Sequence, residues 1–132
     1  MRQIQRSPGR VTVQEAAGHT GHSTADENGT PSRSADGAVL LDVREPCEWQ
    51  AGHAPGAVHA PLSALAAGAP LPPEALGRPL VVICRSGNRS RQAAELLTAR
   101  GAEAVDVIGG MRDWAEAGLP VVDPQGGDGT VA

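Results

Sequence analysis

Three nearly continuous apolar runs constrain the fold of this chain more than any other feature. They are residues 38–43 (AVLLDV), 80–84 (LVVIC) and 104–108 (AVDVI). Each has the length of a β-strand and lacks the polar–apolar alternation of a strand with one solvent face. Helical patterns separate them. Strands that are apolar on both faces and alternate with helices indicate a parallel sheet covered on both sides, so the expected fold class is α/β.

Residues 90–101 (SRQAAELLTARG) carry the clearest helical pattern. Ala93, Ala94, Leu96 and Leu97 form its apolar stripe, and Gly101 is placed to end it. Shorter elements are expected as follows: a strand and helical turn over 11–17, a helical turn over 44–52, a short strand at 57–59, helices over 62–68 and 111–118, and a last edge segment at 119–122.

The 132 residues correspond to one domain. We place it at residues 11–122, between a flexible N-terminus at 1–10 and a flexible tail at 123–132 that holds no core residues. Residues 19–37 are rich in Gly, Ser, Thr, Asn and Asp and predict a polar surface loop or a disordered insertion.

Missing residue types exclude several chemistries. All 11 basic residues are Arg, so a lysine-dependent phosphate loop, a Schiff base and pyridoxal-phosphate chemistry are impossible.

The net charge of −4 gives no reason to expect nucleic acid or an anionic membrane as a partner. No window reaches the length of a membrane span, and the N-terminus lacks the apolar region of a secretory signal, so a cytoplasmic location is expected. No cofactor or metal is implied.

Cys84 is the strongest candidate for chemistry. It follows a buried strand and precedes the best helix, which is where ligands bind in open α/β sheets. The loop after it, residues 85–89, contains a Gly and an Asn that permit positive φ, so that backbone N–H groups turn inward and stabilise an anion. Arg85, Arg89 and Arg91 add positive charge, and these effects together favour a thiolate nucleophile. The competing interpretation is a small buried cysteine with a packing role.

Other polar residues have structural interpretations. Asp42 and Arg44 end the first buried strand and are expected to form a hydrogen-bonded pair or network that supports the cysteine loop. His53 is expected to fix a turn. Cys47 is expected to have no role, with the alternative that it forms a disulfide with Cys84 after oxidation. The two tryptophans are expected to pack in the core or at its rim.

Three segments resemble the rhodanese (sulfurtransferase) family: 40–62 (LLDVREPCEWQAGHAPGAVHAPL), 81–97 (VVICRSGNRSRQAAELL) and 107–121 (VIGGMRDWAEAGLPV). They are similar to its Asp-Val-Arg strand, its Gly-His-x-Pro-Gly-Ala segment, its cysteine loop and its Gly-Gly-Met ending. They occur in the family's order, and the resemblance spans about residues 11–122.

The resemblance implies a five-stranded parallel sheet between helices and a persulfide on Cys84. Arg85 and Arg89 would orient an anionic donor. The backbone of the loop would surround the outer sulfur, and the loop residues are Arg85, Ser86, Gly87, Asn88 and Arg89. Sulfur would pass from thiosulfate or a persulfide to a thiol or cyanide.

Three alternatives to this activity are carried forward. The first is a sulfur-carrier module that receives its sulfur from a partner protein, such as a sulfur-relay protein. The second is a phosphatase or arsenate reductase. The Cys-x4-Arg spacing from Cys84 to Arg89 disfavours it, because the loops of those relatives resemble a Cys-x5-Arg pattern. The third is an inactive scaffold, which the retained cysteine disfavours.

Overall fold

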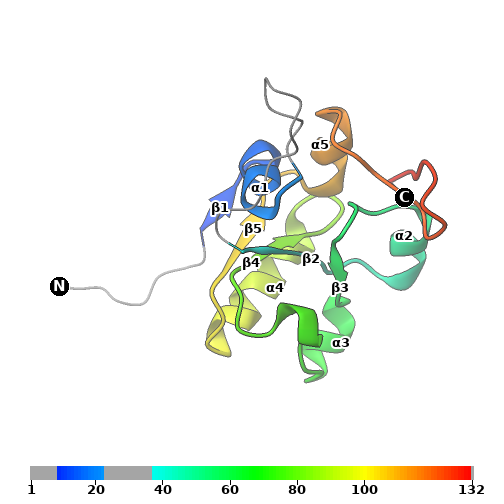
Figure 1. The fold of residues 1–132 in the computed structure, drawn as a ribbon. Helices are drawn as coiled ribbons and strands as arrows, with labels where there is room; N and C mark the ends of the chain where they lie inside the picture. Colours follow the sequence, from blue (N-terminus) through cyan, green and yellow to red (C-terminus); the bar gives the residue numbers. More distant parts are fainter. Residues whose placement is uncertain (1–8, 23–36, 132) are drawn as a thin grey trace.

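The structure is a computed structural model that describes residues 9–22 and 37–131. Its centre is a five-stranded sheet in the order β1-β5-β4-β2-β3, in which all strand pairs are parallel. The strands, which Figure 1 shows in the middle of the molecule, are β1 Arg10–Val11, β2 Val39–Asp42, β3 Val58–His59, β4 Leu80–Ile83 and β5 Ala104–Val107. The expected α/β class and the parallel sheet are confirmed.

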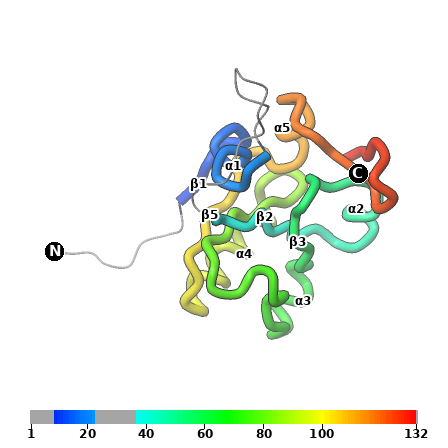
Figure 2. Tube along the Cα trace, in the orientation of Figure 1, coloured from blue at the N-terminus to red at the C-terminus, as the bar shows by residue number. Residues whose placement is uncertain are grey.

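Helices cover both faces of the sheet, and successive residues of the central strands point to opposite sides. On one face Leu41 and Val82 pack with α3 Leu62–Ala66, the 3₁₀ turn Pro73–Ala75 and α4 Asn88–Ala99. On the other face Leu40 and Ile83 pack with α1 Val13–Thr20 and α5 Gly110–Glu116. The trace in Figure 2 shows these two helical layers. Every residue of β2 and β4 is buried, which explains why both strands are apolar except for Asp42 at the end of β2.

The first helix is longer than the expected turn. Thr12 and Glu15 form a capping box, because the Thr12 side chain accepts from the Glu15 N–H and the Glu15 carboxylate accepts from the Thr12 N–H. The helix then continues to Thr20 and ends at Gly21, whose φ is 78°. Residues 19 and 20 are therefore helical rather than part of the polar loop, and residues 23–36 of that expected loop lie outside the described residues.

The remaining helix boundaries differ slightly from the sequence prediction. α4 begins at Asn88, two residues earlier than expected, because Gly87 takes the left-handed conformation at its N-cap. Gly101 has a φ of 94° just beyond the helix, as its expected role requires. α2 spans Pro46–Ala51 and ends at Gly52.

The expectation that residues 119–122 form a last edge segment of the sheet is wrong. Val122 forms antiparallel bridges with His53 and Asp128, away from the five-stranded sheet. The sheet edge beside β5 is instead occupied by β1, where the N–H groups of Asp106 and Ile108 donate to the carbonyls of Gly9 and Val11. The N-terminal strand β1 therefore forms the sheet edge beside β5.

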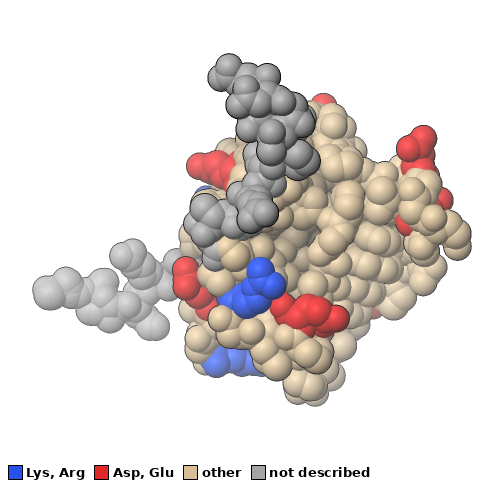
Figure 3. Space-filling model, in the orientation of Figure 1, with Lys and Arg blue, Asp and Glu red and all other residues tan. Residues whose placement is uncertain are grey.

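Residues 123–131 make contacts that a tail without core residues would lack. The Thr130 N–H donates to the Ala51 carbonyl, and Val131 packs against the second core cluster. The flexibility of residues 123–132 stays a prediction. In the described ranges no helix has the length and apolar character of a membrane span. The face in Figure 3 carries scattered charges and no large patch of one sign.

Candidate active site

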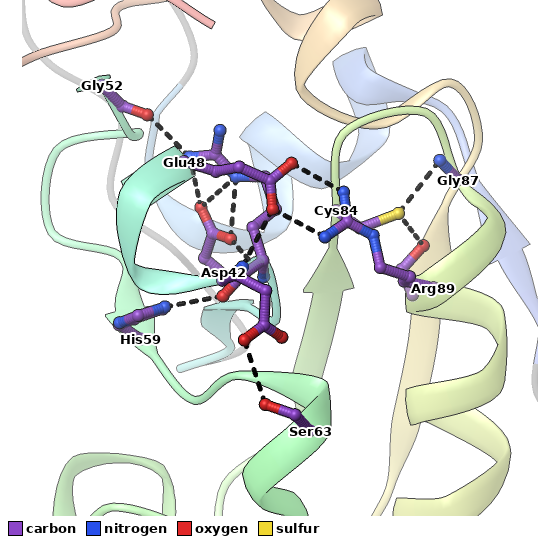
Figure 4. Close-up of polar contacts among 11 residues, drawn as sticks. Asp42, Glu48, Gly52, His59, Ser63, Cys84, Gly87 and Arg89 are labelled. Atoms are coloured by element: carbon purple, nitrogen blue, oxygen red, sulfur yellow. Dashed lines mark hydrogen bonds and ion pairs between the residues drawn. The ribbon is translucent and has the colours of Figure 1, made fainter. Parts of the chain in front are cut away.

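Cys84 lies directly after β4, at the carboxyl end of a central strand. Its thiol is buried, with 1% of the residue exposed, and it forms part of the core cluster under α4. The Sγ atom accepts a hydrogen bond from the Gly87 N–H at 3.0 Å and donates to the Ser90 Oγ at 3.4 Å (Figure 4). The strand and the first turn of α4 therefore place the sulfur beneath the loop.

The loop is held from outside through its carbonyl groups. Residues at the first turn of α5 donate backbone hydrogen bonds, Met111 to the Cys84 carbonyl at 2.7 Å and Arg112 to the Arg85 carbonyl at 3.0 Å. In a planar trans peptide the N–H points opposite to the carbonyl. The N–H groups of Arg85 and Ser86 therefore point away from α5, and they find no acceptor among the described residues.

Two glycines make this close approach possible. A Cβ on Gly110 would lie 2.3 Å from the Cys84 carbonyl oxygen, so only glycine lets α5 reach the loop. Gly87 has a φ of 105°, which lets its N–H face the sulfur while its carbonyl faces outward. Positive φ occurs only at glycines among the described residues, so Asn88 does not adopt it. It begins α4 instead.

A buried polar chain leads from the sulfur to the sheet edge. The Ser90 hydroxyl, which is fully buried, donates to the Asp106 carboxylate at 3.4 Å. Arg10 of β1 donates to both Asp106 oxygens and, at 3.2 Å, to the Gly87 carbonyl. The hydrogen bond to Asp106 raises the pKa of Arg10. One arginine thus neutralises the buried carboxylate and anchors the loop.

Arg89 is held in an ion pair. Its guanidinium donates two hydrogen bonds to Glu48 of α2, at 2.6 and 2.8 Å. These bonds lower the pKa of the Glu48 carboxyl from 4.5 to about 2 and raise the pKa of Arg89. Figure 4 shows Glu48 facing Arg89 across the mouth of the loop. By contrast, Arg85 is exposed and pairs with no carboxylate among the described residues.

Asp42 and Arg44 form the expected pair, but the other side-chain hydrogen bond of the pair is to Gly52 and not to the cysteine loop. Both are fully buried, and Arg44 donates to both Asp42 oxygens and, at 2.6 Å, to the Gly52 carbonyl. Its Nη1 is the buried side-chain nitrogen without a hydrogen-bond partner among the described residues. No hydrogen bond from this pair's side chains reaches residues 84–89 of the described structure. The pair joins β2 to the end of α2, and support of the loop through it stays a prediction.

Trp49 is stacked between two imidazoles. Its ring centroid lies 3.6 Å from that of His53 and 4.6 Å from that of His59. His53 also bonds to the Trp49 carbonyl through Nδ1, and its backbone exchanges hydrogen bonds with Val122. Trp114, in contrast, is fully buried in the core. The stack orders the segment between α2 and β3.

Cys47 is exposed on α2, and both cysteines are free thiols in the structure. A disulfide between Cys47 and Cys84 stays a hypothesis, which peptide mapping after mild oxidation would test. Within residues 9–22 and 37–131, no group of three or more His, Cys, Asp and Glu side chains is arranged to hold a metal.

The comparisons with known proteins identify the family. A family model described as the rhodanese-like domain matches residues 27–117, which is more than half of the chain. The chain belongs to the rhodanese family. A protein of Allochromatium vinosum named sulfurtransferase is 35% identical over 104 residues, which cover 76% of this chain and 95% of that protein.

Two further relatives are informative. An uncharacterized protein of Synechocystis is 40% identical over 91 residues, which cover 68% of this chain, so the chain spans half of that relative. The crystal structure of a rhodanese-related protein from Thermoplasma volcanium matches with a TM-score of 0.57 and 37% identity, covering 65% of this chain and 84% of that one. The rhodanese fold and a place in a sulfur-transfer family are thus shown.

Sequence reasoning missed four residues around the rhodanese loop: Arg10, Glu48, Ser90 and Asp106. Two of them carry a signal in the sequence. Ser90 is the polar member of a helical stripe that continues through Ala93, Ala94 and Leu97. Asp106 interrupts an apolar strand. Polar residues at buried positions are normally hydrogen-bonded, so both pointed to a partner.

Proposed function

We propose that this protein is a sulfurtransferase in which Cys84 carries sulfane sulfur as a persulfide. The observation that supports it most directly is the environment of the Cys84 sulfur, which accepts the Gly87 N–H beneath a loop whose carbonyls are anchored outward. Outward carbonyls leave the N–H groups of the loop available to an anion. A persulfide sulfur is such an anion.

In the first step the Cys84 thiolate attacks the sulfane sulfur of thiosulfate. Its electron pair forms the new S–S bond, and the S–S bond of thiosulfate breaks with its pair on the departing sulfite. A thiol persulfide donates in the same way and leaves as a thiolate. The N–H groups of Ser86, Asn88 and Arg89, which find no acceptor among the described residues, would surround the outer sulfur.

In the second step an acceptor takes the outer sulfur. A thiolate attacks it, the S–S bond to Cys84 breaks, and the electron pair returns to the Cys84 sulfur. The products are an acceptor persulfide and the starting thiolate, and cyanide would give thiocyanate by the same route. The Ser90 hydroxyl lies 3.4 Å from Sγ, where it can hydrogen-bond to the Cys84 sulfur both as the thiolate and as the persulfide.

The test is the intact mass of the reduced protein after incubation with thiosulfate. We expect the wild type and Cys47→Ser to gain one sulfur atom that dithiothreitol removes, and Cys84→Ser to gain none. If no protein gains sulfur from thiosulfate, the same assay with a protein persulfide donor distinguishes a sulfur carrier from a loop that binds another electrophile. Gain of sulfur by Cys84→Ser would refute the assignment of Cys84.

A further inference from the structure

We propose that Glu48 is a specificity-determining residue of this transfer: by neutralising Arg89, it favours sulfur donors with one negative charge over dianionic donors such as thiosulfate. This inference rests on the proposed function. The sequence predicts that Arg89 orients an anionic donor. In the structure both of its terminal nitrogens are instead taken by a carboxylate, at 2.6 and 2.8 Å.

The pair is fixed at both ends. Glu48 lies in the first turn of α2, where its Oε1 also accepts the Glu45 N–H at 2.9 Å. Arg89 lies in the first turn of α4, whose start is set by the conformation of Gly87. The side chains of Glu48 and Arg89 are 15% and 33% exposed, so water screens the pair only in part. A donor therefore meets a pair whose charges cancel.

The other charges near the mouth do not compensate for this cancellation. Glu45 adds a second carboxylate whose charge acts on Arg89. Arg44 is committed to Asp42, and Arg10 to Asp106. Arg85 is exposed, so its charge is screened by solvent. The Cys84 thiolate is itself an anion, and a dianionic donor must approach it while the two partly buried arginines near the sulfur, Arg10 and Arg89, are each paired with a carboxylate.

The size of the effect follows from Coulomb's law. One extra unit charge about 4 Å from another changes a rate roughly fivefold in water and roughly a thousandfold at the lower dielectric of a protein surface. We therefore expect that removing the Glu48 charge improves kcat/KM for dianionic thiosulfate about tenfold, somewhat below the roughly thirtyfold that two unit charges at 4 Å give in water. A monoanionic donor gains less, about threefold, because it carries half the charge.

The experiment compares two donors with the same sulfonyl–sulfur chemistry. Thiosulfate carries two negative charges and methanethiosulfonate carries one, and the latter leaves as methanesulfinate when Cys84 takes its outer sulfur. Initial rates are measured for the wild type and Glu48→Gln with cyanide as acceptor. The glutamine keeps an oxygen for the Arg89 and Glu45 donors but removes the charge. Glu74→Gln, an exposed residue of the 3₁₀ turn before β4, is the matched control.

We expect Glu48→Gln to lower KM for thiosulfate more than KM for methanethiosulfonate, with kcat for each donor within about twofold of the wild-type value. Glu74→Gln leaves the ratio of the two kcat/KM values unchanged. Arg89→Gln, which leaves Glu48 unpaired, shifts the ratio the opposite way. In the wild type, added salt raises kcat/KM for thiosulfate relative to methanethiosulfonate, and in Glu48→Gln it does so less.

An unchanged donor ratio in both site variants overturns the proposal. A higher thiosulfate KM in folded Glu48→Gln also overturns it, because Glu48 would then orient Arg89 toward the donor. The salt dependence of the wild type tests the same point if a variant fails to fold. Should the wild type accept sulfur from neither donor, sulfur transfer from thiosulfonate-type donors fails as the function, and this result is separate from a failure of donor selection.

Discussion

The backbone N–H of Gly87 lies 3.0 Å from the Sγ atom of Cys84, and the carbonyl of the same glycine accepts from Arg10 at 3.2 Å. Residue 87 therefore couples the sulfur to the edge strand β1. Its φ of 105° allows both groups to face their partners at once. A change in this conformation moves the donor away from the sulfur and the loop away from its anchor.

Substitution Gly87→Ala tests that coupling. The left-handed conformation costs a residue with a Cβ roughly 1–2 kcal/mol. The added Cβ would also lie 3.2 Å from the Gly109 nitrogen and 3.3 Å from Arg10 Nη2, so the loop must shift. We expect a loss of stability in chemical unfolding and a fall in the rate of sulfur loading of at least about tenfold, because a well-placed donor to the sulfur is displaced.

The matched control is Gly77→Ala. Gly77 also has a positive φ, 72°, but a Cβ there meets nothing within 4 Å. Alanine at residue 77 must therefore also adopt a positive φ, while the site is untouched. Gly77→Ala should lose stability and keep its loading rate, and equal loading rates in the two variants would show that Gly87 has only a conformational role.

The Asp42–Arg44 pair gives a prediction about stability. Both side chains are fully buried, so Asp42→Asn leaves a guanidinium in the core without its counter-charge. Breaking a buried pair in this way costs about 3–5 kcal/mol, whereas replacing both partners with apolar residues is often nearly neutral. Chemical unfolding should show a large loss for Asp42→Asn and recovery of most of it in Asp42→Leu/Arg44→Met. A loss below about 1 kcal/mol in the single variant would contradict a charged buried pair.

The sheet could be predicted from the sequence because strands buried on both faces leave continuous apolar runs. β2, β4 and β5 were predicted within one residue of their bounds at each end. The failure at 119–122 has a different cause. That segment is apolar because Leu119 and Val121 pack against the second core cluster, and composition does not distinguish such packing from a sheet edge.

The position of Cys84 could also be predicted, because it depends on residues adjacent in sequence. Its partners could not, because they depend on strand order. Arg10 meets Asp106 only because β1 pairs with β5, a contact across 96 residues. Glu48 meets Arg89 because α2 and α4 both start at the carboxyl edge of the sheet. The role of Arg89 in orienting a donor stays a prediction, and nothing in the sequence pointed to this carboxylate.

The Glu48–Arg89 pair predicts a change in acid stability. The pKa of Glu48 is lowered from 4.5 in the unfolded chain to about 2 in the folded protein, chiefly by hydrogen bonds from Arg89. A depressed carboxyl pKa stabilises the fold above the unfolded value and loses this contribution as pH falls toward the folded value. The difference in unfolding free energy between wild type and Glu48→Gln should be constant above pH 4.5 and shrink between pH 4.5 and 2. A difference that does not vary with pH would contradict an ionised pair.

Arg10 provides the final prediction, since it lies before the matched rhodanese region at 27–117 and yet contacts the loop. Arg10→Gln removes the cation from Asp106, which is 1% exposed and must then hold its charge with Ser90 as its remaining side-chain partner among the described residues. Because Arg10 is itself 38% exposed, we expect a loss of about 1–3 kcal/mol rather than the full cost of a broken buried pair. Sulfur loading should slow about tenfold, because the Gly87 peptide loses its anchor and an uncompensated carboxylate lies near the thiolate.

The double variant Arg10→Gln/Asp106→Asn should regain stability, because both charges are removed. It does not regain the hydrogen bond to the Gly87 carbonyl, so its loading should recover only in part. Arg78→Gln, which removes an arginine that donates to the Gly37 carbonyl, should leave loading unchanged. Full recovery of loading in the double variant would show that Arg10 acts through the charge of Asp106 alone.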